Sequence, residues 1–154
     1  MRMRWKRFDR GFLKADSGIA AIEFAVFGAV LCFLAIATAD VGMGFYSYMQ
    51  VQNAAQAGAE YAAVHGWNSA AITNAVTNAT SVSGLSASPA PTQFYGCVVG
   101  TSVNSVAQGT VCTNGMSAGT YVTASAQRTY TTLISYPGFA SSYDQTSTST
   151  VRIQ

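Results

Sequence analysis

Charged side chains are scarce in this chain of 154 residues. Asp, Glu, Lys and Arg together make up 9% of it, whereas a typical soluble domain carries about 25%. Histidine occurs once and cysteine three times, and the sequence has neither the Cys/His spacing of a zinc site nor a glycine-rich phosphate loop. Apolar residues account for 49% of the chain. This composition argues against a freely soluble cytosolic protein, and we expect no enzyme activity, no metal and no cofactor.

Positive charge is confined to one end of the chain. Six Lys and Arg side chains lie within residues 1–16, where only two acids oppose them, so this segment carries a net charge of +4. The remainder has two cations, Arg128 and Arg152, and four acids. Binding to nucleic acid needs a basic face that displaces counterions from phosphate. The body of the protein has no such face, so we expect no nucleic-acid partner.

A long apolar run follows the basic segment. Residues 18–39 contain one charged side chain, Glu23. About 20 apolar residues span a bilayer as a helix, and the run is too long for a buried strand. We therefore predict a membrane-spanning helix over about residues 19–40. The positive-inside rule leaves the basic leader, residues 1–18, in the cytoplasm and places the C-terminus outside it.

Three interpretations of this run remain open. The first is a plain single-pass envelope anchor. The second is a signal peptide, because residues 37–39 form an A-x-A site before Asp40 whose cleavage would release an exported binding module. The third starts from Glu23, because a carboxylate costs about 2.5–3.5 kcal/mol at the centre of a membrane helix and should have a partner. Cleavage after Gly18 would create an ammonium group on Ile19 that could pair with Glu23 of the same chain or of a neighbour.

The residues around this site resemble a class III prepilin signal. A basic leader precedes Gly18, Glu23 stands at position +5 from the expected cut, and Phe24 and an apolar helix follow. The Gly-x-x-x-x-Glu-Phe form is similar to that of the TadE/TadF-type pseudopilins of Tad (Flp) type IV pili. The small-residue-rich segment at residues 52–63 is also similar to that family. Ala29 stands where the family often has a proline. Without the proline, a kink of the helix at that point is not expected.

The resemblance implies a structural assembly protein, a minor pilin or pseudopilin. A prepilin peptidase would cut between Gly18 and Ile19, and Glu23 and Phe24 would act in assembly and recognition. The implied partners are the prepilin peptidase, other pilin or pseudopilin subunits, the inner-membrane assembly platform and the lipid bilayer. The implied location is the bacterial inner membrane and, after assembly, an extracellular pilus, with roles in initiation, at the tip or in surface attachment.

The helix is expected to continue beyond the membrane. No proline occurs before Pro89, and small residues recur at spacings of three and four as far as Val64. Gly66 follows as a C-cap. We predict one helix over about residues 18–65 and assign residues 19–66 to it.

Residues 67–154 are expected to form an extracytoplasmic α+β body. Asn68 and Ser69 would cap a second, short helix over about residues 70–80. Alternating patterns predict a small antiparallel sheet with a turn at residues 137–138 and strands over residues 94–101, 119–135 and 147–153.

Two cysteines, Cys97 and Cys112, flank a loop rich in Gly, Ser and Thr, and in an oxidising compartment we expect them to form a disulfide. The expected whole is an α+β protein shaped like a lollipop, with a long membrane-spanning helix carrying a small body stapled by that disulfide.

Overall fold

The computed structural model describes residues 16–135, 137–138 and 140–153. Most of the predicted basic leader, residues 1–15, lies outside the described residues. The chain separates into two compact units, Met1–Val41 and Gly42–Gln154, and each is described by itself below.

The first element is α1, a helix of 50 residues from Asp16 to His65 that begins in the first unit and ends in the second. It confirms the long helix predicted from the sequence. The helix ends as expected at Gly66, which has a φ of +78° and donates its N–H to the carbonyl oxygen of Ala62 at 2.9 Å. A glycine in the left-handed region just past the last turn is a common helix stop, since it has no Cβ to clash.

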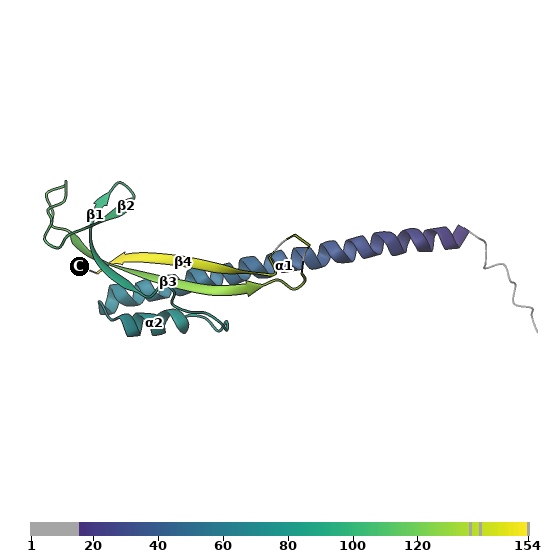
Figure 1. Ribbon diagram of the computed structural model, residues 1–154, viewed down its shortest axis with the longest axis horizontal. Coiled ribbons are helices and arrows are strands. Elements are labelled where there is room, and N and C mark those ends of the chain that lie inside the picture. Colours follow the sequence, from purple (N-terminus) through teal and green to yellow (C-terminus); the bar gives the residue numbers. More distant parts are fainter. Residues whose placement is uncertain (1–15, 136, 139, 154) are drawn as a thin grey trace, which may run out of the picture. The chain divides into compact units, whose positions relative to one another are not determined.

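A short helix and a four-stranded antiparallel sheet complete the second unit (Figure 1). In the sheet the spatial order is β2-β1-β3-β4. The five elements are α2 (Ser69–Thr77), β1 (Thr92–Val99), β2 (Ser102–Val106), β3 (Gly119–Thr131) and β4 (Ser142–Arg152). The predicted α+β class, second helix and antiparallel sheet are therefore confirmed.

The second helix starts where its capping residue predicts. The Oδ1 of Asn68 accepts a hydrogen bond from the backbone N–H of Ala71 at 3.1 Å, which satisfies one of the free donors of the first turn. The helix ends at Thr77, three residues before the predicted end. There Asn78 donates from both its backbone N–H and its side-chain amide to the carbonyl of Asn74, which closes the last turn.

The sheet differs from the prediction at four places, of which the smallest is β1, which lies two residues earlier than the predicted 94–101. The strand β2 was not predicted, because its Ser- and Asn-containing sequence is typical of a loop; Gly100, at φ +62°, allows the tight turn that pairs it with β1. β3 ends at Thr131, four residues early. β4 begins at Ser142, five residues early, because it pairs with β3 over its full length from Thr131↔Ser142 onwards.

The core of the second unit lies where α1, α2 and β3 meet, and these elements lie alongside one another (Figure 1). A Cβ added to Gly58 would stand 2.5 Å from Cγ2 of Val76 and 2.9 Å from the Cβ of Ala124, so only glycine permits this approach. The fully or almost fully buried core side chains are small or branched: Val51, Ala54, Ala55, Ala59, Ala62, Ile72, Val76, Val122, Ala124 and Ala126.

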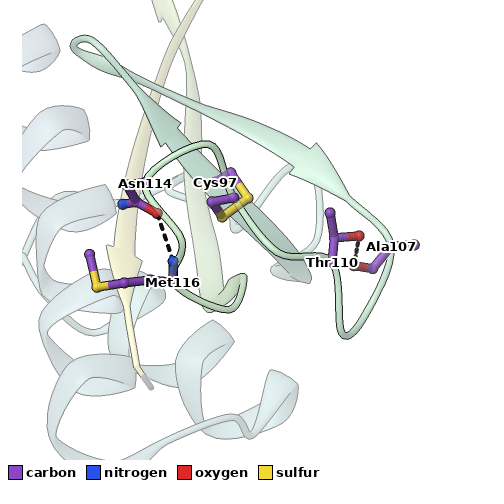
Figure 2. Close-up of a disulfide and its surroundings, with 6 residues drawn as sticks. Cys97, Ala107, Thr110, Asn114 and Met116 are labelled. Carbon is purple, nitrogen blue, oxygen red and sulfur yellow. Dashed lines mark hydrogen bonds between the residues drawn. A yellow bond between two sulfur atoms is a disulfide. The ribbon is translucent and has the colours of Figure 1, made fainter.

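The predicted disulfide is present. It joins Cys97 in β1 to Cys112 in the loop between β2 and β3, with a Cα–Cα distance of 5.6 Å (Figure 2). The hydrogen bonds that hold the same loop include two that involve side chains, from Thr110 Oγ1 to the carbonyl of Ala107 at 2.8 Å and from the N–H of Met116 to Asn114 Oδ1 at 3.1 Å. A loop with few buried side chains is thus tied to the sheet.

Candidate membrane and assembly surface

In the first unit, apolar side chains cover the whole circumference of α1. Within the part of the chain that the structure describes, α1 is the one helix long and apolar enough to cross a membrane, and none of its most apolar 18-residue stretch is buried. The exposed side chains, between 44% and 80% accessible, are Ile19, Ile22, Phe24, Val26, Phe27, Val30, Leu31, Phe33, Leu34 and Ile36. A helix that is apolar all round needs lipid or other helices around it.

All four residues predicted for processing and assembly lie on this helix. Gly18 is its third residue, and Ile19, Glu23 and Phe24 are exposed, the last at 80%. Ile19 and Glu23 are four residues apart, so they lie on one face of the helix, one turn from each other.

In the second unit, α1 has two different faces. One face, which includes Ser47 and Val51, is buried. On the opposite face Phe45, Tyr46 and Met49 are 68%, 57% and 54% exposed. Between residues 52 and 60 the exposed positions of that face carry polar side chains: Gln52, Asn53, Gln56 and Glu60. The helix therefore changes from apolar to polar on its exposed side within about one turn after Met49.

A buried polar network holds β3 and β4 to α1. The Oγ of Ser47 donates to Gln145 Oε1 at 2.6 Å and accepts from Arg128 Nη1 at 2.7 Å. Gln145 Nε2 donates to the carbonyl of Gly44 at 2.9 Å, and Arg128 Nε donates to the carbonyl of Ser83 at 3.1 Å. Ser47 and Gln145 are 1% and 6% exposed. Buried polar groups of this kind are costly unless they are paired, so the network fixes one arrangement of the strands on the helix.

Sequence reasoning missed this network. Its hydrogen bonds join residues that are 45 to 101 positions apart along the chain, and each residue is unremarkable in its own segment. The available signal is weak: Ser47 occupies a buried helical position one turn from Gly44 and Val51, where an apolar residue would be usual.

The disulfide-bonded loop carries a second exposed apolar surface. Val111 and Met116 are 67% and 61% exposed, and Val98, the neighbour of Cys97 in β1, is 53% exposed. Figure 2 shows Met116 on the same loop as the hydrogen-bonded Asn114. These side chains can make apolar contacts, but they carry no acidic, basic or nucleophilic group. Within the described ranges, no group of three or more His, Cys, Asp or Glu side chains could hold a metal ion.

These features define a protein with one N-terminal apolar helix that fits a single-pass membrane anchor, followed by an α+β body with a disulfide. Residues 18–60 match the TadE family, described as TadE-like protein. The match begins at Gly18, includes Glu23 and Phe24, and confirms the resemblance seen in the sequence. No curated protein and no solved structure matches the chain.

The matched segment makes the N-terminal part of this chain TadE-like, consistent with a pilin-like protein associated with a Tad pilus. That family is structural rather than catalytic.

Proposed function

We propose that this protein is a minor pilin of a Tad type IV pilus. The observation that carries the proposal is the coincidence of the TadE-like match, residues 18–60, with an apolar helix surface that no described part of the chain covers. In this proposal residues 19–40 hold the precursor in the bacterial inner membrane, with residues 1–18 in the cytoplasm and the body on the other side. The body then serves in initiation, at the tip or in surface attachment, with its disulfide-bonded loop as the presented surface.

Processing is proposed to occur between Gly18 and Ile19 by a prepilin peptidase. Hydrolysis of that peptide bond leaves a carboxylate on Gly18 and a free ammonium group on Ile19. Because Ile19 and Glu23 lie one helical turn apart, the new cation and the carboxylate are close enough to pair within a chain or between neighbours. In a dry bundle of helices such a pair fixes the axial register of one subunit against the next.

Assembly is driven, in this proposal, by the exposed apolar side chains of the first unit. Once the subunit leaves lipid, packing against other pilin helices removes this surface from water at about 25 cal/mol per Å² of apolar area. Phe24, the most exposed of these side chains at 80%, would contribute to recognition of the neighbouring helix.

The test is a comparison of two acid substitutions in α1. Glu23→Ala should abolish pilus assembly while leaving the protein in the membrane fraction, because it removes the partner of the new ammonium group. Glu60→Ala is the matched control, since Glu60 is also an exposed acid of α1 but lies in the second unit. Pili counted by electron microscopy and subunit measured by immunoblot give the two readouts. Normal piliation with Glu23→Ala would overturn the mechanism.

The N-terminal sequence of the protein from native membranes separates the competing fates. A chain that starts at Ile19 supports the pilin. A start at Asp40 would instead identify an exported module released after Ala39. An intact Met1 would leave a plain membrane anchor and would remove the role proposed for Glu23.

A further inference from the structure

One end of the sheet packs on the buried face of α1 at the same level along the helix as the apolar part of its exposed face. A Cβ added to Gly44 would stand 2.8 Å from Oη of Tyr143 and 3.7 Å from Cε1 of Tyr130, so these two rings approach the helix at this level. The two tyrosines are paired across β3 and β4, with ring centroids 5.5 Å apart. The β3–β4 connection therefore emerges close to the helical turn that precedes Phe45.

Apolar groups are exposed on both elements at this end. On the helix they are Phe45, Tyr46 and Met49, and on the sheet side Leu133 and Tyr143 are 53% and 47% exposed. On a soluble protein, exposed apolar side chains are usually scattered one by one, and several at one end are uncommon. Here they gather at the end of the second unit where the chain enters it, since Gly42 is the first residue of that unit.

We propose that this end of the second unit is seated in the outer polar–apolar interface of the bilayer, with the exposed face at residues 45–49 and the side chains of Leu133 and Tyr143 in contact with lipid. The inference rests on the membrane anchoring in the proposed function and adds a second membrane contact, made by the folded body. The occupant of the surface is the lipid bilayer, because the surface is continuous with the apolar run that spans it.

The lengths agree with this position. The inference moves the span a few residues along from residues 19–40: if Glu23 stands at the cytoplasmic boundary, the 20 residues from Phe24 to Met43 rise about 30 Å, the thickness of the hydrocarbon core. Residues 44–49 then rise about a further 9 Å, slightly more than the zone of roughly 5–8 Å that headgroups occupy on each side. The change to polar side chains at Gln52 falls where water begins. Asp40 does not interrupt the lipid-facing surface, because its side chain is buried.

The side-chain types also favour an interface rather than the hydrocarbon core or a charged surface. Tyr and Phe place an apolar ring among acyl chains, and Tyr keeps its hydroxyl at the headgroups. Between Arg128 and Arg152 the sequence has no Lys or Arg. Attraction to anionic lipid needs such cations. The depth of this end of the body in the bilayer should therefore be the same in neutral and in anionic vesicles.

Spin labelling of the full chain tests the proposal directly. The free Cys32 is first replaced in a Cys32→Ala background, while Cys97 and Cys112 stay paired. Single cysteines are then introduced, labelled with a nitroxide and reconstituted in vesicles of neutral phosphatidylcholine or of phosphatidylcholine with phosphatidylglycerol. Collision with oxygen, which partitions into lipid, is compared with collision with a water-soluble nickel chelate.

The labelled variants are Phe45→Cys, Met49→Cys and Leu133→Cys, with Gln56→Cys as the aqueous control and Val30→Cys as the control for the span.

The proposal expects a ratio of oxygen to nickel collisions several-fold higher at positions 45, 49 and 133 than at position 56, equal in both lipid mixtures. Aqueous behaviour at positions 49 and 133 with a buried label at position 30 would overturn this inference and leave the anchor intact. Aqueous behaviour at position 30 as well would overturn the anchor itself. Spectral broadening at position 49 that disappears on dilution with unlabelled protein would show that a second copy covers the face, and would also overturn the inference.

Discussion

The two ends of α1 share a backbone conformation but not an environment. In the first unit the helix exposes large apolar side chains on all sides, whereas beyond Gly42 one face is buried. Correspondingly, the first stretch is apolar at nearly every position. The second places small residues on the buried face and, between Gln52 and Glu60, polar residues on the other. The comparison teaches that the helix is specified twice: by uniform apolarity where lipid or other subunits must surround it, and by a stripe of Ala, Gly and Val where its own sheet does.

The difference between the two parts of α1 is tested most strongly by truncating one apolar side chain in each unit and comparing the loss of stability. Ile72→Ala should lower the free energy of unfolding of the body by about 2–5 kcal/mol, because Ile72 is fully buried and the change leaves a cavity. Phe27→Ala should change it by less than about 0.5 kcal/mol, because Phe27 is 68% exposed. Urea unfolding of the full chain in detergent, followed by near-ultraviolet circular dichroism, measures both. Equal losses would mean that the first unit contributes to the core.

The cysteines allow the same comparison between the two units, because the disulfide lies in the second unit and Cys32 lies in the first. The double change Cys97→Ser and Cys112→Ser should destabilise the body by about 3 kcal/mol, the chain-entropy value for a loop of 15 residues. Cys32→Ala should leave its stability unchanged, because Cys32 is a free, exposed cysteine in the first unit. The same unfolding experiment without reductant gives the difference. A double variant as stable as the parent would show that the loop is held by its other contacts.

The buried polar network should show coupling between α1 and β4. Ser47→Ala and Gln145→Leu should each cost about 1–3 kcal/mol, because each leaves a buried partner without its hydrogen bond. The double variant should cost less than the two together, since the orphaned groups are then both removed. Thr148→Ala, an exposed position on β4, is the control. Strict additivity would indicate that the two side chains act independently.

The last prediction compares two glycines of α1, where replacement by alanine should change the stability of the body in opposite directions. Gly42→Ala should stabilise the body by up to about 1 kcal/mol, because nothing lies within 4 Å of the new methyl group and alanine favours the helix. Gly58→Ala should destabilise it by about 1–3 kcal/mol, because the new methyl group overlaps Val76 and the Cβ of Ala124, which has no rotamer to change. Thermal unfolding of the two variants measures the shift in each direction. A stabilised Gly58→Ala variant would contradict the close packing at that position.

Much of this architecture was predictable because it depends on neighbours along the chain. Local spacing predicts α1 and its stop at Gly66, the cap at Asn68 and the alternation in β3. The cysteine pair could be predicted because only two cysteines lie in the body. What could not be predicted depends on distant partners. The strand β2 forms because β1 is beside it, and the early start of β4 needs the whole length of β3.

The candidate site divides in the same way. The Gly18–Glu23 spacing is local and visible in the sequence, and it leads to the family. The network around Ser47 is invisible there, since nothing near Ser47 in the sequence indicates an arginine 81 positions later or a glutamine 98 positions later.

That separation also sets the order in which the body can be completed. Synthesis proceeds from the N-terminus, so Ser47 and the carbonyl of Gly44 are available about a hundred positions before Gln145. Until β4 arrives, β3 has an unpaired edge and the helix lacks its final strand contact, a state that invites pairing with the wrong chain. Addition of residues 142–152 along β3 is therefore the step that closes the sheet. A chain that stopped before this segment would keep an open sheet edge, a feature by which proteases recognise an unfinished protein.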